Sequence, residues 1–224
     1  MKPNDTTAIT VGGQPLRLLP EKAALLPETS TLLIADAHIG KGLSFRKLGV
    51  PVPHGTTAET LALMSALVER WRAKRIVFLG DFLHSARSHG PTTMDTVARW
   101  RVAHASLGLT LVRGNHDDHA GDPPARLGIE AVDEPLMQGD LALCHHPVAR
   151  APAYVLAGHL HPAVGLGGRA NDHVRLPCFW FGPNVGVLPA FGAFTGLYTI
   201  RAAPDERVFA AADGRVIELG AARH

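Results

Sequence analysis

The stretch Leu111-Val112-Arg113-Gly114-Asn115-His116-Asp117 joins an apolar run to a glycine and three polar side chains. An apolar run of this length is typical of a strand that is buried on both faces in a layered α/β structure. Four other apolar runs end in the same way, and the residues that follow them include Asp36 and His38, Asp81, His145, and His159 and His161. This repeated pattern indicates both the fold and the chemistry.

The first half of the sequence alternates apolar runs of strand length with helical patterns. Residues 1–30 contain several prolines, and we interpret them as an edge hairpin and lead-in. Strands are then expected at 31–35, 75–79 and 109–112. Repeated strand and helix units of this kind indicate a parallel sheet with right-handed crossovers.

Two amphipathic helices are expected between these strands. The first begins at Thr56, which has Glu59 at the spacing of a capping box, and its inner face would carry Leu61, Met64, Leu67, Val68 and Trp71. The second begins at about Thr92, and its inner face would carry Met94, Val97, Ala98, Val102 and Ala105. Residues 39–49 are expected to form a loop or a short helix.

The second half consists of short runs rich in β-forming residues, separated by Asp, Gly and Pro. Strands are expected at 129–132, 136–137, 141–144, 154–157, 174–181, 194–200, 208–211 and 216–219. This spacing predicts a second, largely antiparallel sheet. The expected fold class is therefore α/β, a four-layer αββα sandwich of two mixed sheets flanked by helices, formed as one domain over residues 1–224.

The composition is that of one well-buried domain, with 224 residues, 46% of them hydrophobic, and a formal net charge of +2. This charge is compatible with a polyanionic partner but does not require one. Cys144 and Cys178 have no paired spacing, so we expect small buried thiols in a reduced protein. We find no signal-peptide pattern and no apolar run near the ~20 residues of a membrane span, so a cytoplasmic location is expected.

The polar residues after the strands are candidate metal ligands, because ligands of open α/β sheets collect at the carboxyl ends of the strands. The candidates are Asp36, His38, Asp81, Asn115, His145, His159 and His161. Seven oxygen and imidazole donors are too many for one tetrahedral zinc ion but suit two divalent ions that share a carboxylate. Two such ions support in-line attack of water at phosphorus.

Two further residues have candidate catalytic roles. His116 follows Asn115 directly and could act as general acid at the leaving oxygen, or as a cationic stabiliser of the transition state. Asp117 could hold the His116 ring in the correct orientation. Arg113 has no assigned role.

Some assignments have a simpler alternative. A single histidine is more often structural than a ligand, and only the ordered set favours metal binding. His145 and His146 compete for one ligand position, and strand alternation favours His145 because it shares a face with Leu141 and Leu143. For Lys41, Arg46 and His84, contact with substrate phosphates and a solvated loop remain equal alternatives.

The ordered motifs Asp36-x-His38, Gly80-Asp81, Gly114-Asn115-His116-Asp117, His145 and Gly158-His159-x-His161 resemble those of the calcineurin-like metallophosphoesterase superfamily. The resemblance covers residues 36 to 161 and implies a dinuclear Mn, Fe or Zn centre on an αββα sandwich. It implies that Asp36, His38 and His161 hold the first metal, that Asp81 bridges, and that Asn115, His145 and His159 hold the second.

The flanking sequences resemble a narrower group, the bacterial ligase-associated metallophosphoesterases of the PdeM type. They are Asp36-Ala-His-Ile-Gly-Lys with Phe45-Arg46, Val50-Pro-Val-Pro-His-Gly55, Gly80-Asp-Phe-Leu-His-Ser85 and Leu188-Pro-Ala-Phe-Gly-Ala-Phe-Thr-Gly196. Ala37 departs from the larger apolar residue expected there. This resemblance implies a Mn-dependent enzyme that cleaves phosphodiesters and phosphomonoesters, including DNA, and is encoded beside a helicase, an exonuclease and an ATP-dependent DNA ligase.

The sequence therefore predicts a Mn-preferring phosphodiesterase that acts on DNA, as an endonuclease in repair. One alternative is a phosphatase or phosphodiesterase for small nucleotides. Another is an interaction scaffold that kept the fold but lost the chemistry.

Overall fold

The structure is a computed structural model that describes residues 5–47, 49–52, 55–167, 173–193 and 195–220. Its first sheet has seven strands in chain order. These are β1 (Thr7–Val11), β2 (Gln14–Leu18), β3 (Ala24–Leu26), β4 (Thr31–Ile34), β5 (Arg75–Leu79), β6 (Gly108–Val112) and β7 (Ile129–Val132). Strands β4, β5 and β6 are parallel, as predicted. The prediction that residues 129–132 belong to the second sheet is wrong, because β7 pairs in parallel with β6. Strands β1 to β3 add an antiparallel edge of three strands.

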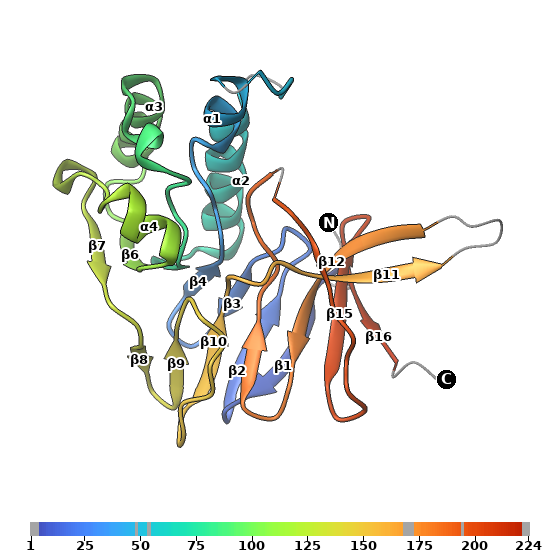
Figure 1. The fold of residues 1–224 in the computed structure, drawn as a ribbon. Coiled ribbons are helices and arrows are strands. Elements are labelled where there is room, and N and C mark those ends of the chain that lie inside the picture. The colour runs from blue at the N-terminus through green and yellow to red at the C-terminus, as the bar shows by residue number, and fades with distance from the viewer. Residues whose placement is uncertain (1–4, 48, 53–54, 168–172, 194, 221–224) are drawn as a thin grey trace.

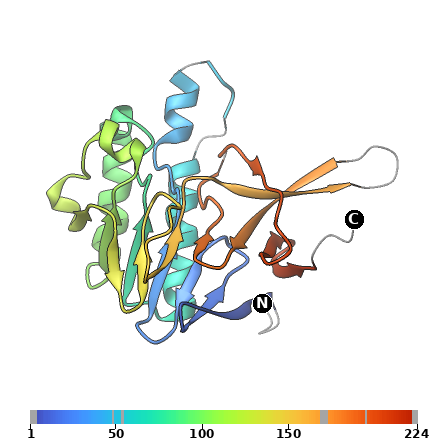
Figure 2. The same ribbon diagram turned by 60° about the horizontal axis from the view of Figure 1, so that its bottom comes forward.

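The second sheet has nine strands and is mixed. They are β8 (Leu136–Gln138), β9 (Leu141–Leu143), β10 (Tyr154–Ala157), β11 (Pro162–Gly167), β12 (His173–Phe181), β13 (Val185–Val187), β14 (Tyr198–Thr199), β15 (Arg207–Ala212) and β16 (Arg215–Leu219). Strands β9, β10 and β13 are parallel to one another, and the antiparallel hairpin β11–β12 extends away from the sandwich (Figures 1 and 2). The strands β11 and β13 were not predicted.

The helices cover only the first sheet in the described part of the chain (Figure 1). They are α1 (Lys41–Lys47), α2 (Thr56–Trp71), α3 (Pro91–Ala103) and α4 (Asn115–Ala120), with short 3-10 turns at Ala86–His89 and Ala125–Leu127. After β7 every described element is a strand, so the outer helix layer of the predicted αββα sandwich is not seen there. The β9–β10 connection, for example, contains Pro147 and Pro152, which disfavour a helix.

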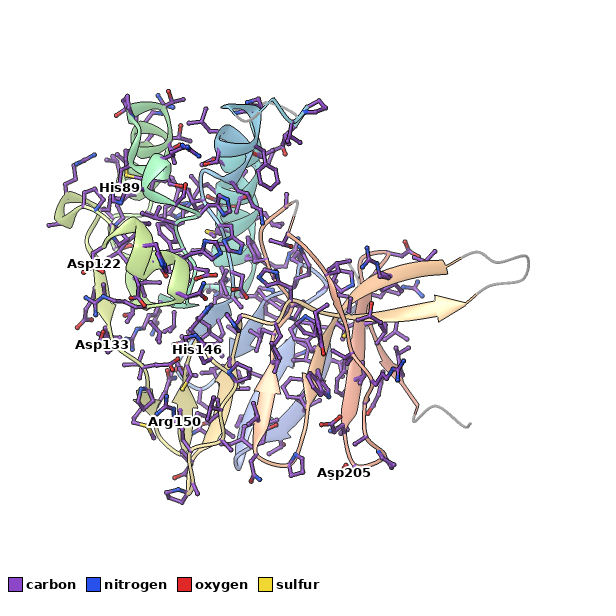
Figure 3. The ribbon with its side chains drawn as sticks, viewed as in Figure 1. His89, Asp122, Asp133, His146, Arg150 and Asp205 are labelled. Carbon is purple, nitrogen blue, oxygen red and sulfur yellow. The ribbon has the colours of Figure 1, made fainter. Side chains whose placement is uncertain are left out.

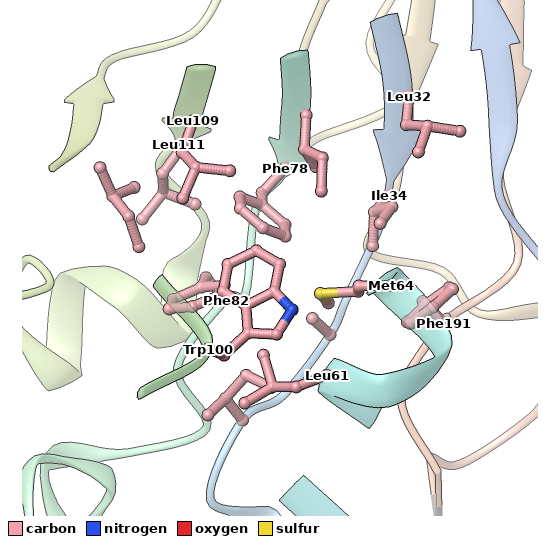
Figure 4. Packing of buried hydrophobic residues seen from close by; sticks show 14 of the residues in the cluster. Leu32, Ile34, Leu61, Met64, Phe78, Phe82, Trp100, Leu109, Leu111 and Phe191 are labelled. Carbon is pink, nitrogen blue, oxygen red and sulfur yellow. The ribbon is translucent and has the colours of Figure 1, made fainter. Parts of the chain in front are cut away.

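Two apolar layers hold the sandwich together. One lies between the first sheet and the helices and includes Met64, Phe78 and Trp100 (Figure 4). The other lies between the two sheets and includes Leu33 and Phe179. Strand β4 contributes alternate residues to each layer, which explains its continuous apolar sequence.

The predicted helix faces are correct in α2 and partly wrong in α3. Thr56 is the first residue of α2 and Gly55 is its N-cap, with no side-chain hydrogen bond, so the predicted capping box is not formed. In α3, Val102 is 79% exposed, and Trp100 is buried in its place with its indole N–H donating to Ser65. Helix α3 ends at Ala103, so Ala105 lies beyond it.

Several other expectations can be compared with the structure. Cys144 and Cys178 are buried free thiols, as predicted. Among the described residues, the helices are too short or too polar to span a membrane. The predicted strand at 194–200 is reduced to β14, and Pro53, His54 and Phe194 of the quoted motifs lie outside the described residues.

Candidate metal centre

The predicted ligands come from two sheets and meet where their parallel strands end. The residues from the first sheet follow β4, β5 and β6, and those from the second follow β9 and β10. The parallel register pairs Ile34 with Phe78 and Phe78 with Leu111, so that the ends of these strands are level. This arrangement places side chains that are far apart in sequence in one place.

The backbone at the centre is held in an unusual conformation. Asp36, His38, Asp81, His159 and His161 all have a left-handed φ, between 46° and 72°. Such a conformation is unfavourable for residues with a side chain, by about 1 kcal/mol or more each, and is found at functional sites. The loops support one another, because Asp36 N–H donates to Gly80 O (3.3 Å) and His38 N–H donates to Asp81 O (2.9 Å).

Asp36, His38 and His161 form the first ligand group, with donor atoms within 4.8 Å of one another. His161 Nε2 lies 3.5 Å from Asp36 Oδ1. Asp36 Oδ1, His38 Nε2 and His161 Nε2 are buried, and none of them has a hydrogen-bond partner in the described structure. Burial of such atoms without partners is unfavourable, so this donor set fits a metal ion.

The second ligand group surrounds His145, which is fully buried. His145 Nδ1 lies 3.1 Å from the carbonyl of Leu79, and donation of its proton there leaves Nε2 as the ligand atom. His145 Nε2 lies 2.9 Å from Asn115 Oδ1 and 3.0 Å from His159 Nδ1. Three potential ligand atoms therefore face one another.

Asp81 lies between the two groups. Its Oδ2 is 3.9 Å from His38 Nε2, and its Oδ1 is 3.6 Å from His145 Nε2. One carboxylate oxygen thus faces each set of ligands, which is the arrangement of a bridging residue. Burial, and then the charge of Asp36, raise the pKa of Asp81, so a cation here would relieve the repulsion between two buried carboxylates.

Burial also controls the charge of the imidazoles. It lowers the pKa of His38, His145 and His159 below the usual range, and neighbouring cationic groups lower the pKa of His38 further. These rings are therefore neutral near pH 7, which is the form that binds a metal ion. The electrostatics and the donor types fit two divalent metals.

Comparison with solved structures identifies the family. The crystal structure of the Pseudomonas putida nuclease MPE has 42% sequence identity and a TM-score of 0.85, and the match covers 96% of this chain and 100% of that one. The chain belongs to the calcineurin-like metallophosphoesterases. It is therefore a hydrolase of phosphoester bonds.

More distant structures were also found. YfcE, a phosphoesterase from E. coli, has 14% identity and a TM-score of 0.41, with 86% of this chain and 99% of that chain covered. A protein of unknown function from Aquifex aeolicus has 14% identity and a TM-score of 0.38, with 63% and 81% covered. No family model and no curated protein sequence matches this metallophosphoesterase.

Asp117 has a different role from the one that we predicted. Its carboxylate is buried and accepts hydrogen bonds from the backbone N–H groups of Phe82 (3.4 Å), Leu83 (3.1 Å) and Gly114 (3.1 Å). Asp117 therefore joins the loops after β5 and β6, and the interpretation that it orients His116 is wrong. The sequence could not reveal this, because the donors are backbone groups.

His116 is oriented by a backbone carbonyl instead. Its Nδ1 lies 2.8 Å from His84 O, and its Nε2 lies 3.9 Å from Asp81 Oδ2. The His116 side chain is 39% exposed, so Nε2 is accessible to a substrate at the metallophosphoesterase centre. This geometry is compatible with the predicted general acid.

Of the three predicted phosphate contacts, two lie near the centre. The His84 ring stacks on the His116 ring at 5.3 Å, and burial lowers the pKa of His84 to about 4. Burial lowers the pKa of Lys41, and the charges of Asp36 and Asp81 partly oppose this. The Lys41 ammonium lies 5.6 Å from the centroid of the Phe45 ring. Arg46 instead donates to the carbonyl of Val52 at 3.4 Å.

One segment supports the site in a way that the sequence did not reveal, although it was quoted as a flanking motif. Phe191 N–H donates to Ala35 O (2.9 Å) and Gly192 N–H donates to Asp36 O (3.1 Å), so the chain after β13 holds the first ligand loop. A Cβ atom at Gly192 would lie only 2.5 Å from Ala37 O. Only the small residues of this segment in the sequence could have indicated such a close approach.

Arg113, which had no assigned role, is a surface anchor. Its guanidinium makes two hydrogen bonds to Asp122, both 2.8 Å long, and a third to Asp133 at 2.7 Å. It therefore joins the segment after α4 to the segment after β7.

Proposed function

We propose that this metallophosphoesterase is a two-metal phosphodiesterase that prefers Mn and cleaves DNA as an endonuclease. The observation that carries the proposal is that six of the seven predicted ligands lie in two groups of three, and Asp81, the seventh, lies between the groups. His146 also lies beside His145 and His159. The 42% identity to a structure described as a nuclease favours a nucleic acid as substrate.

The side chains of the site would have different roles in hydrolysis. Asp36, His38 and His161 would hold the first metal, Asn115, His145 and His159 the second, and Asp81 both. When bound, two divalent ions lower the pKa of the attacking water and compensate charge on the phosphate oxygens. Lys41 and His84 would bind phosphate oxygens that are not displaced.

His116 would deliver the proton to the leaving oxygen. Its Nδ1 proton is donated to His84 O, so protonated Nε2 is the group that faces the substrate. Nε2 lies 3.9 Å from Asp81 Oδ2, beside the carboxylate that would hold both metals. Transfer of that proton neutralises the developing alkoxide and leaves a neutral imidazole.

A role in DNA repair, and an association with an ATP-dependent DNA ligase, a helicase and an exonuclease, rest on the family resemblance alone. These two points stay predictions. They can be checked by the neighbourhood of the gene and do not affect the chemistry.

The proposal is tested with the purified chain, several divalent metals and three substrates: bis-p-nitrophenyl phosphate, plasmid DNA and circular single-stranded DNA. We expect cleavage of the ester and of DNA, strongest with Mn²⁺, and loss of both in Asp81→Asn but not in the surface variant Asp122→Asn. Hydrolysis of 2′,3′-cyclic nucleotides with intact DNA would instead support a small-nucleotide phosphodiesterase. No hydrolysis with any metal would support the inert scaffold.

A further inference from the structure

The ligands of the metal centre come from two different sheets, so the positions of the two sets relative to each other must be fixed. The residues Asp36, His38, Asp81 and Asn115 follow strands of the first sheet, whereas His145, His159 and His161 follow strands of the second. Residues 133–135 connect the edge strand β7 of the first sheet to β8 of the second (Figure 1). A metal site requires ligand positions that are fixed to within about 0.5 Å.

Glu134, in this crossover, contacts the ligand loop after β9 through both carboxylate oxygens. Oε2 accepts hydrogen bonds from the backbone N–H groups of His145 (2.8 Å) and His146 (2.9 Å). Oε1 accepts one from Arg150 Nη2 (3.1 Å) and lies 3.2 Å from His146 Nδ1. The Glu134 side chain is only 20% exposed, and hydrogen bonds to an ionised acceptor are the stronger kind.

These contacts act on both imidazole ligands of the second group. Glu134 fixes the backbone of His145, and the carbonyl of Leu79 fixes its ring, so both ends of this residue are held. His146, oriented by Glu134, packs its ring 4.8 Å from the rings of both His145 and His159. Figure 3 shows His146 and Arg150 beside the crossover. The first group has no such contact with Glu134 among the described residues.

We propose that Glu134 is a positioning residue for the second metal. It holds His145 directly and His159 through the ring of His146. It thereby fixes the positions of the second sheet's ligands relative to the ligands of the first sheet. The inference rests on the proposed two-metal function. Because partners that orient metal ligands typically change metal affinity by 10-fold to 100-fold, the second ion should bind at least about tenfold more weakly without the carboxylate.

Three variants and one control separate the contributions. Glu134→Ala removes every contact, whereas Glu134→Gln keeps an oxygen that can accept the two backbone N–H groups. His146→Ala tests the route to His159 without changing Glu134. Asp133→Ala is the matched control, since Asp133 (labelled in Figure 3) is the adjacent acid and its side chain is 90% exposed. It pairs with Arg113 and not with a ligand loop.

The metal-free chains are titrated with Mn²⁺ by calorimetry, and electron paramagnetic resonance distinguishes single ions from coupled pairs. Thermal unfolding of the metal-free form is measured as well, to detect a general loss of stability. Wild type and Asp133→Ala should bind two ions. Glu134→Ala should bind one ion normally and the second at least tenfold more weakly, Glu134→Gln should lie between, and His146→Ala should weaken the second ion only.

Several results would overturn the inference. Binding of both ions by Glu134→Ala within twofold of wild type would show that the carboxylate does not position ligands. Equal weakening of both ions, with a lower unfolding temperature of the metal-free chain, would show a general structural role. If Glu134→Ala does not fold, Glu134→Gln and His146→Ala decide between these results. Failure of wild type to bind two ions would instead contradict the proposed function.

Discussion

Replacement of Asp117 by alanine tests the corrected role of this residue. The substitution leaves the buried N–H groups of Phe82, Leu83 and Gly114 without an acceptor. Each unpaired group is unfavourable by about 1 to 2 kcal/mol, or roughly 3 to 6 kcal/mol in total. The same substitution also removes a buried charge, which partly offsets this loss.

The offset depends on pH. Burial is the largest effect on Asp117 and raises the pKa of its carboxyl from 3.8 to about 6, even though the three N–H groups favour the ionised form. Because the pKa is raised in the folded state, the free energy of unfolding of wild type decreases as the pH increases from 3.8 to about 6. Relative to a pH below both values, this decrease is about 3 kcal/mol at pH 7. At pH 5 the decrease is about 1 kcal/mol smaller than at pH 7. Asp117→Ala should therefore be destabilised by roughly 2 kcal/mol at pH 7 and by about 1 kcal/mol more at pH 5.

The assay is urea unfolding of the metal-free proteins at both pH values, with His116→Ala as the control. The control should unfold like wild type, because the His116 side chain is 39% exposed and, in the described part of the chain, it does not hydrogen-bond to the Asp117 carboxylate. Asp117→Ala should also lower hydrolysis of good and poor leaving groups equally. A stability change below 0.5 kcal/mol at both pH values, together with selective loss on poor leaving groups, would refute this reasoning and restore Asp117 as the partner of His116.

Three other substitutions give distinct outcomes. His116→Ala should slow aryl phosphodiesters with poor leaving groups most, and equal losses over a series of leaving groups would argue against a general acid. Gly192→Ala should weaken Mn²⁺ binding about tenfold by calorimetry, because its Cβ would lie 2.5 Å from Ala37 O. In the control Gly165→Ala the nearest atom to the new Cβ is 3.8 Å away, so this variant should bind Mn²⁺ normally. Equal affinities of the two variants would contradict the close approach. Arg113→Ala should change the free energy of unfolding by at most about 1 kcal/mol and leave hydrolysis intact, and a loss of activity would show that this surface pair supports the site.

The sequence predicted the elements whose signals are local. Strand β6 and its continuation to His116 were recognisable because an apolar run, a glycine and polar donors follow one another directly. The parallel half of the first sheet followed from the same pattern. The ligand set was recognisable because each member lies at the end of such a run.

The contacts that depend on tertiary structure were not predictable in this way. Asp117 accepts from the backbone of residues 35 and 34 positions earlier, and Glu134 accepts from a loop in the other sheet. Trp100 was missed on the inner face of α3, although its ring is buried and its N–H finds a partner in Ser65. An acceptor for a backbone N–H leaves no pattern in the sequence, because any residue can supply the donor.

The central claim is that two divalent ions bind where the parallel strands of the two sheets end, and a crystal soaked in Mn²⁺ tests it most directly. Anomalous difference density should show two ions that share Asp81, one beside Asp36, His38 and His161, the other beside Asn115, His145 and His159. A single ion, or two ions that do not both contact Asp81, would contradict the claim.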